Sequence, residues 1–229
     1  MRQIWSDLLF LHWAVPAEVI APTLPPGLEV DTFGGNAYLG LVPFTMRGVR
    51  PLGLPAVSWL SNFHEVNVRT YVHRKGRDPG VWFYSLDAEN RIAVWLARLS
   101  FHLPYNWARM SLDHDQAEEG VIDYTSTRRG SGTSASCRIR YRPIGLPLPA
   151  APGTLEFFLL ERYLLYAFGR GQLHVGRVHH QPYPVQGAEL LVFEEELLAA
   201  SGFKRPDNGA LIHYASGVDV EVFPLRSID

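Results

Sequence analysis

The stretch that decides the fold is Asn62-Phe63-His64-Glu65-Val66-Asn67-Val68-Arg69-Thr70-Tyr71-Val72. The polar side chains at its alternate positions are Glu65, Asn67, Arg69 and Tyr71. They alternate with valine and threonine, and this period of two predicts a β-strand with a carboxyl, an amide, a guanidinium and a phenol on one face. Periodicity alone favours a row that faces water, since antiparallel sheets often have one solvated face, and the alternative is a row that lines a pocket.

Length and composition limit what the chain can be. With 229 residues, of which 47% are hydrophobic, it can bury a large core, and we expect one domain over residues 1–229. The formal net charge of -2 argues against a nucleic-acid surface, which normally carries a basic stripe. Arg138, Arg140 and Arg142 alternate along an expected strand, so we interpret them as a solvated face.

Cysteine usage and the N-terminus indicate the compartment. The single cysteine, Cys137, excludes an intramolecular disulfide and a cysteine-based zinc site, and it fits a reducing cytoplasm. The N-terminus lacks the pattern of a signal peptide, and no apolar run approaches the roughly 18 residues of a membrane span. We therefore expect a cytoplasmic protein with no membrane partner.

Frequent proline and glycine, 17 and 20 residues, divide the chain into short elements and favour strands over a helical bundle. The expected strands cover residues 8–13, 37–44, 63–72, 81–86, 121–126, 135–141, 173–180 and 218–223. The polar segment 74–80 contains Gly76, Pro79 and Gly80 and should turn the polar strand back as a hairpin. A mostly antiparallel sheet is predicted.

Two helices are predicted by apolar residues at i, i+3, i+4 and i+7. The first covers residues 88–101, with Asp87 as a candidate N-cap. Its expected core-facing stripe consists of Ile92, Trp95, Leu96 and Leu99. The second covers residues 154–168, with Thr154 as its N-cap and a stripe that extends to Tyr166.

Two further segments have a pattern of their own. A shorter helix is expected over residues 194–201, ended by Gly202 at a C-cap position. The proline-rich segment 143–153 could be a domain linker, but its apolar character favours a crossover that lies on the body of the protein.

Seven segments, taken in order, carry a resemblance to a known family. They are Pro25-Pro26-Gly27-Leu28-Glu29, Leu41-Val42-Pro43-Phe44, Asn62 to Val72, Phe83-Tyr84-Ser85-Leu86-Asp87-Ala88, Leu103-Pro104-Tyr105, Glu161-Arg162-Tyr163 and Gly217-Val218-Asp219-Val220. Together they resemble the YqjF-like family of uncharacterised bacterial proteins over nearly the whole chain. The resemblance implies an acetoacetate decarboxylase-like fold, which is α+β and β-rich, with a mostly antiparallel closed β-barrel or cone around the active site. It implies no activity of its own.

Two places are similar to acetoacetate decarboxylase itself. Phe63-His64-Glu65-Val66 resembles the strand that supplies an active-site glutamate there, which implies that role for Glu65. Residues 90–106 resemble its helix and the Gly-Tyr-Pro-Lys-Lys tract that follows, but Tyr105 and Asn106 replace the two lysines. Because neither side chain can form an imine, Schiff-base decarboxylation is not expected.

Lys75 and Lys204 are the chain's only lysines, and neither is a good substitute. Lys75 lies beside Arg74 and Arg77 in the expected turn, and adjacent positive charge lowers the pKa of a lysine. The effect is small in water, because charges ~4 Å apart interact there by only ~1 kcal/mol. We expect both lysines to be exposed.

The candidate site is therefore a polar patch inside the barrel. Glu65 is the predicted catalytic residue, as a general acid or base in an apolar cavity. Arg69 is predicted to hold a carboxylate or a phosphate, because its guanidinium is a planar fork. The other predicted substrate-binding residues are Asn67, Tyr71, Tyr105 and His102. Same-face residues at i and i+4 lie ~13 Å apart, so Glu65 and Arg69 should not pair with each other, although each could pair with an adjacent strand.

No cofactor and no metal site is predicted. His179 and His180 are adjacent, so on a strand they point to opposite faces and cannot hold one ion together. A site assembled from His12, His64 or His180 with Glu65 stays open.

Three hypotheses for function follow. The first is a small-molecule enzyme, lyase-like or acid–base, that acts on a carboxylate- or carbonyl-bearing metabolite without a lysine. The second is a non-catalytic protein that binds an organic acid or an apolar metabolite in the same cavity. The third is a structural or interaction protein whose barrel is filled by its own side chains. The oligomeric state is left open by the sequence.

Overall fold

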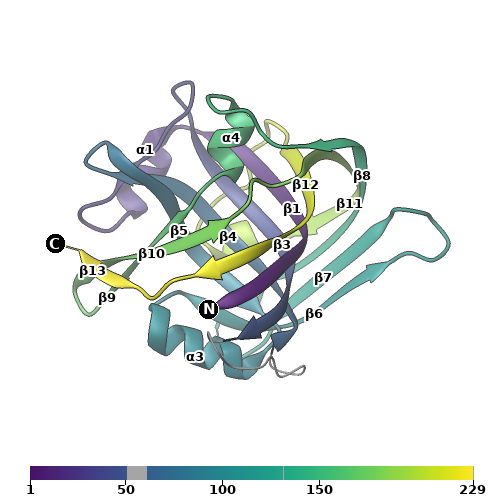
Figure 1. The fold of residues 1–229 in the computed structure, drawn as a ribbon, viewed down its shortest axis with the longest axis horizontal. Helices are drawn as coiled ribbons and strands as arrows, with labels where there is room; N and C mark the ends of the chain where they lie inside the picture. Colours follow the sequence, from purple (N-terminus) through teal and green to yellow (C-terminus); the bar gives the residue numbers. More distant parts are fainter. Residues whose placement is uncertain (51–60, 131, 229) are drawn as a thin grey trace.

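The structure is a computed structural model that describes residues 1–50, 61–130 and 132–228, with only the backbone described at residues 96–100. These residues form one sheet of 13 strands with a few short helices (Figure 1). The strands are β1 (Arg2–Val15), β2 (Glu29–Val30), β3 (Ala37–Arg50), β4 (Phe63–Arg74), β5 (Arg77–Ala88), β6 (Tyr105–His114), β7 (Ile122–Arg128), β8 (Ser136–Leu148), β9 (Leu164–Gly169), β10 (Gln172–His180), β11 (Val185–Glu195), β12 (Leu211–Val222) and β13 (Arg226–Ile228). The helices are α1 (Ala17–Ile20), the 3-10 helix η1 (Ala21–Thr23), α3 (Arg91–Phe101), α4 (Leu155–Leu160) and α5 (Leu197–Ala200).

The sheet curls back on itself. Its strands pair in the order β13-β10-β9-β5-β6-β7-β8-β11-β12-β1-β3-β4-β2, and β4 also pairs with β5 while β10 also pairs with β12. All pairs in the described residues are antiparallel except those of β5 with β6 and β9. The predicted β-rich, mostly antiparallel α+β fold is confirmed. Because β4 pairs with β5, the strands from β5 through β6, β8, β12 and β1 to β4 form a continuous circuit of pairings that returns to β5.

Each of the eight predicted strands is present, most of them longer than expected. The predicted hairpin after the polar strand is also confirmed, with Arg74 opposite Arg77 across the turn. Lys75 and Gly76 take positive φ angles of 52° and 69° there, a conformation that favours glycine at the second position. The sequence missed β6, β9 and β11, together with the short strands β2 and β13.

Strands β1, β3 and β4 are buried on both faces. One face packs in a cavity-side core against β5, β9, β10 and α4, and this core includes Leu8, Phe10, Phe44, Tyr71 and Leu159. The other face packs in a far-side core against β6, β7 and β8, and this core includes Leu9, Leu11, Val66, Val68 and Ile139. The polar row of β4 therefore lies on an interior face.

The first predicted helix is present as α3, but it starts and packs differently. Its N-cap is Asn90, whose side chain accepts hydrogen bonds from the N–H groups of Ile92 and Ala93, both at 3.0 Å, whereas Asp87 belongs to β5. The expected stripe is wrong for Ile92 and Trp95, which are 45% and 61% exposed. The face of α3 that packs against the protein is offset from the predicted stripe by about one residue, or roughly 100° around the helix axis, and it includes the buried Val94. The side chains of the other two stripe residues lie outside the described part of the chain.

The second predicted helix is much shorter than its periodicity indicated. Thr154 is its N-cap as predicted, but α4 ends at Leu160 and the chain continues as β9. Tyr166 pairs with Val175 of β10 and with Trp82 of β5, so this part of the apolar stripe belongs to a strand. Long-range pairing overrides a local pattern that fits both structures.

The segment after residue 141 is a strand where a crossover was expected. Strand β8 continues to Leu148, with Ile144 opposite Gly187 and Leu148 opposite Val185 of β11. Strand β11 also occupies the start of the third predicted helix, so α5 begins only at Leu197. Gly202, at a φ of 90°, follows the C-cap residue of α5, as the sequence indicated.

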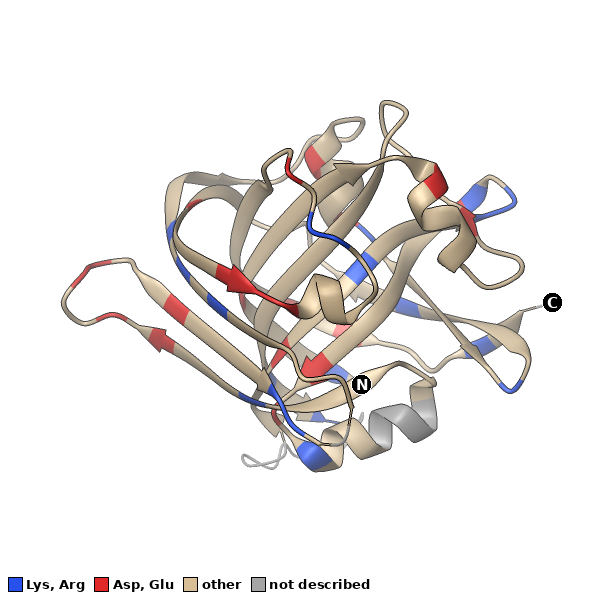
Figure 2. Ribbon diagram, turned by 180° about the vertical axis from the view of Figure 1, so that it is seen from behind, with Lys and Arg blue, Asp and Glu red and all other residues tan. Residues whose placement is uncertain are grey.

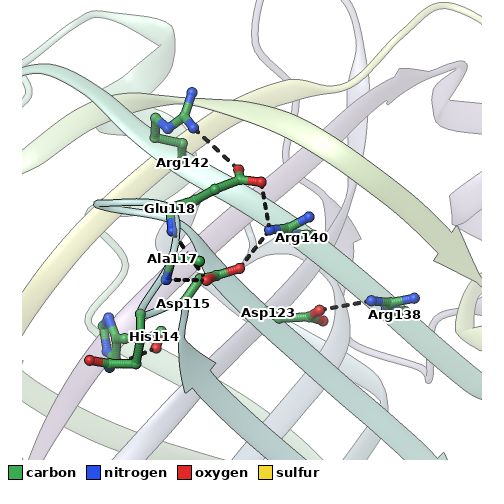
Figure 3. A network of polar contacts seen from close by, with 9 residues as sticks. His114, Asp115, Ala117, Glu118, Asp123, Arg138, Arg140 and Arg142 are labelled. Atoms are coloured by element: carbon green, nitrogen blue, oxygen red, sulfur yellow. Dashed lines mark hydrogen bonds and ion pairs between the residues drawn. The ribbon is translucent and has the colours of Figure 1, made fainter.

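The alternating arginines of β8 lie on a solvated face, as predicted. Arg138 pairs with Asp123 at 2.9 Å, and Arg140 pairs with Asp115 at 2.6 Å (Figure 3). Figure 2 shows acidic residues on the β6–β7 hairpin beside the basic residues of β8. Among the helices of the described residues, none has the length and apolar character needed to cross a membrane.

Candidate functional site

A cavity of about 410 Å³ lies on the cavity side of β4. Four alternate residues of β4 line it, namely Phe63, Glu65, Asn67 and Arg69. The polar row of this strand therefore faces a cavity inside the curled sheet, and the solvated outer face that periodicity favoured is wrong. The cause is the curl of the sheet, which brings β9, β10 and α4 over this face.

The register of β3 against β4 positions the polar side chains. Glu65 lies opposite Phe44, and Arg69 lies opposite Gly40. A Cβ atom at residue 40 would come within 3.1 Å of the ring of His12 and 3.2 Å of Cγ of Arg69. Gly40 therefore leaves room for the Arg69 side chain.

Glu65 is a buried carboxyl group in a mostly apolar environment. It is 2% exposed, and its Oε2 accepts a hydrogen bond of 2.9 Å from the hydroxyl of Tyr105. The pKa of Glu65 is raised to about 8, chiefly by burial and to a smaller extent by nearby Asp87, although hydrogen bonds with Tyr105 and Asn67 act in the opposite direction. The carboxyl group is thus mostly neutral at pH 7.

Tyr105 comes from the start of β6, which runs parallel to β5 with Tyr105 opposite Leu86. Its ring lines the cavity beside Glu65. Burial, followed by the proximity of Glu65, raises the pKa of this phenol well above its ordinary value. Tyr105 therefore remains protonated and donates its hydrogen bond to Glu65 over the physiological pH range.

A buried ion pair lies behind these two residues. The Nε and Nη2 of Arg128 donate to the two carboxylate oxygens of Asp87 at 2.9 and 2.8 Å. Asn106 donates to the same carboxylate at 3.2 Å, so the cluster joins β5, β6 and β7 next to Glu65. Sequence reasoning missed this pair because it interpreted Asp87 as a helix cap and had no signal that linked it to Arg128.

Arg69 lies further along the cavity and contacts only neutral groups. Its Nη2 donates to the hydroxyl of Tyr71 and to the carbonyl of Leu159, both at 3.3 Å. Its guanidinium carbon is 5.6 Å from the ring centroids of Phe10 and Tyr71. Within the described residues Arg69 has no carboxylate partner, and its Nε has no hydrogen-bond acceptor.

Tyr71 supports Arg69 from behind. Its side chain is fully buried, its hydroxyl donates to the carbonyl of Leu159 at 2.7 Å, and it bonds Nε2 of His12 at 2.6 Å. The residues that line the cavity do not include Tyr71. The polar row thus divides into three cavity residues and one supporting residue.

Arg162 is a cavity residue that sequence reasoning missed. It follows α4, pairs with Asp31 at 2.6 Å and donates to the carbonyl of Phe158 at 2.6 Å. Neighbouring Glu161 accepts from the hydroxyl of Tyr163 at 2.6 Å. Both Glu161 and Arg162 lie in a segment that carried the family resemblance, which was the available signal.

His102 is placed away from the cavity, contrary to the prediction. It is the C-cap of α3 with a φ of 49°, in the left-handed region. This turn directs its ring toward Gly169 and to within 5.4 Å of the ring of His174. His102 is absent from the residues that line the cavity.

The lysines and histidines lie where they do not complete the site. Lys75 is exposed in the β4–β5 turn, and Lys204 is paired with Asp207 at 3.4 Å on the surface. His64 bonds Thr45, whereas His180 bonds the carbonyl of the next residue. In the part of the chain that the structure describes, no three His, Cys, Asp or Glu side chains are grouped so as to hold a metal ion.

Comparison with solved structures places the fold among acetoacetate decarboxylase-like proteins. MppR, an enduracididine biosynthesis enzyme complexed with pyruvate, has a TM-score of 0.65 at 12% identity, with 100% of this chain and 90% of that chain covered. An acetoacetate decarboxylase-like enzyme from Sphingomonas wittichii RW1 has a TM-score of 0.65 at 12% identity, with 100% and 92% covered. Acetoacetate decarboxylase from Legionella pneumophila has a TM-score of 0.64 at 12% identity, with 100% and 87% covered.

Sequence comparison gives a nearer relationship. The protein YqjF of Bacillus subtilis (strain 168), described as uncharacterized, is 39% identical over 226 residues, which are 99% of this chain and 91% of that protein. A model of the family DUF2071, described as an uncharacterized conserved protein (COG2071), matches residues 2–219. The family predicted from the seven motifs is thus confirmed, and the chain belongs to the YqjF-like DUF2071 family.

Proposed function

We propose that the cavity binds a small organic acid or carbonyl compound and that Glu65 performs acid–base chemistry on it without a lysine. The observation that carries this proposal is that one cavity is lined both by a buried carboxyl group, that of Glu65, and by the guanidinium of Arg69, which has no carboxylate partner in the described residues. Arg69 would hold the carboxylate of the ligand, because a guanidinium binds carboxylates through a planar fork.

Glu65 suits the role of a proton donor or acceptor. With a pKa of about 8, it is poised near neutral pH, where both protonation states are populated. Tyr105 stays protonated and can stabilise negative charge that develops on a ligand oxygen beside Glu65. The chemistry does not pass through an imine, since both lysines lie on the surface.

Two further observations support a small-molecule function. A solved protein of similar fold, MppR, is complexed with pyruvate, which is itself a small carboxylate that carries a carbonyl group. The cavity of about 410 Å³ has the size of common ligand sites and counts against an interior filled by its own side chains.

The test is Glu65→Gln, which keeps the volume and the hydrogen bond from Tyr105 but cannot exchange a proton. In a screen of keto acids and hydroxy acids, we expect turnover to disappear while the ligand still raises the melting temperature of the variant. Glu118→Gln, on the surface hairpin, is the matched control and should retain full turnover. Unchanged turnover in Glu65→Gln would contradict the proposal.

The second candidate function is ligand binding without catalysis. It is favoured by the fixed hydrogen bonds of Glu65, whose carboxyl group is held by Tyr105 and Asn67. If this alternative is correct, an organic acid binds saturably, Arg69→Met weakens that binding, and no product is formed from any compound in the screen.

A further inference from the structure

The cavity is elongated along β4, and its two ends have different chemistry. Residues 63 and 69 of a strand lie ~20 Å apart at about 3.3 Å per residue, and both line the cavity. Arg69 reaches toward α4 through its hydrogen bond to Leu159, whereas the other end is lined by Ala93 of α3. In Figure 1, α4 and α3 lie at opposite ends of the molecule.

The end at α4 fits one negative charge. Arg69 has only neutral hydrogen-bond partners in the described residues, while the charge of Arg162 is paired with Asp31 at 2.6 Å. Glu161 lies nearby and accepts from Tyr163 and from the N–H of Tyr183. Two carboxylates in this region disfavour a ligand with two negative charges, so a single carboxylate matches it best.

The end at α3 is apolar. It is lined by Met46, Val49, Phe63, Ala93, Phe101 and Val222. Gln3 and Trp5 are the polar exceptions, and their Oε1 and Nε1 atoms are buried without a hydrogen-bond partner in the described residues. The charged groups nearest this end in the described residues are Glu65, which is mostly neutral at pH 7, and the N-terminal ammonium of Met1, which donates to the carbonyl of Val222 at 2.8 Å. Such an environment favours an aliphatic or aromatic group over a second polar group.

We infer that the ligand is an amphipathic monocarboxylic acid, with its carboxylate at Arg69 and an apolar tail that extends past Glu65 to α3. The inference rests on the proposed function, and it adds the substrate class and the direction in which the substrate lies. Glu65 and Tyr105 then face a part of the ligand between its carboxylate and the end of its tail, since Glu65 lies ~13 Å along the strand from Arg69. The tail is bound through burial of apolar surface alone.

The first test measures binding of saturated straight-chain acids, from butanoate to dodecanoate, by isothermal titration calorimetry at pH 7. The expected Kd falls by about fourfold for each added methylene group until the cavity is filled. Arg69→Met should weaken every acid, and alcohols of the same chain lengths should bind more weakly than the acids. Equal binding of alcohols and acids would overturn the assignment of the carboxylate to Arg69.

The second test shortens the cavity at α3. Ala93→Phe should abolish the gain in affinity from long chains, whereas Ile92→Phe adds similar bulk to the exposed face of α3 and should leave the dependence on chain length unchanged. Val49→Phe narrows the same end from β3 and serves if the first variant does not fold. If the Kd is independent of chain length but is raised by Arg69→Met, the inference of an apolar tail is refuted and the proposed function is left intact. A complete lack of binding by any of these saturated acids would refute the inferred substrate class, whereas the proposed function is refuted separately by unchanged turnover in Glu65→Gln.

Discussion

At the scale of single residues, Glu65 is the group whose protonation links stability to the chemistry of the cavity. Its carboxyl is buried without a cationic partner in the described residues, so folding favours its neutral form. The ordinary pKa of 4.5 applies to the unfolded chain, and burial raises the pKa to about 8 in the folded protein. The stabilisation is thus complete below pH 4.5 and is lost as the pH rises through about 8.

Glu65→Gln removes this dependence and tests it. The shift from 4.5 to about 8 corresponds to roughly 5 kcal/mol of pH-dependent free energy of unfolding. We expect the variant to gain stability over the wild-type protein as the pH is raised from 5 to 9, in urea denaturation at each pH. Parallel pH profiles for the two proteins would show that Glu65 is charged in the folded state.

The residues of the site were predictable to different degrees. Glu65, Asn67 and Arg69 share a strand face, so a period of two was enough to group them, and Tyr105 was found through the family resemblance. Arg162 was missed because its place in the cavity depends on where α4 ends, which no local pattern gives. His102 was misplaced because a left-handed C-cap turns its ring away from the cavity.

At the scale of elements, the Asp87–Arg128 pair holds β5, β6 and β7 together beside the site. The Asp87 carboxylate has no exposed surface, and the Arg128 side chain is 8% exposed. Asn106 bonds the same carboxylate and lies next to Tyr105, so the cluster also fixes the strand that carries the phenol. Removal of one member leaves a buried charge without its partner.

Arg128→Met is therefore expected to lower the free energy of unfolding by about 3–5 kcal/mol, measured by urea denaturation. Arg140→Met is the matched control, since Arg140 is 25% exposed in the surface network of Figure 3, and it should cost about 1 kcal/mol or less. The double variant Asp87→Asn with Arg128→Met should recover part of the loss. Equal effects of the two single variants would argue against a special role for the buried pair.

Element boundaries were harder to predict than the elements themselves. The run Leu164 to Tyr166 continues the apolar stripe of α4, yet it pairs with β5 and β10 as a strand. In helix α3, Ile92 and Trp95 of the predicted stripe are exposed, whereas Val94 beside them is buried. In both cases contacts between residues far apart in the sequence decide the outcome, and periodicity does not contain them.

At the scale of the whole molecule, the curl of the sheet explains why one strand can carry both a core and a site. Val66 and Val68 pack in the far-side core, while Glu65 and Asn67 face the cavity on the other side. The cavity is therefore backed by a packed layer that resists movement of its polar groups. A sheet with one solvated face, as periodicity alone suggested, would lack this support.

Two-sided burial predicts where local unfolding is rarest. Amide hydrogens of β1, β3 and β4 should exchange the most slowly, because opening these strands exposes both cores. The tip of the β6–β7 hairpin, at residues 115–120, is mostly exposed and should exchange about tenfold faster or more. Hydrogen exchange followed by mass spectrometry measures both regions in one experiment. Exchange in β4 at the rate of the hairpin tip would contradict a sheet buried on both faces. If the exchange in β4 is slow and a bound acid does not change it, the result supports a cavity that is formed before the ligand binds.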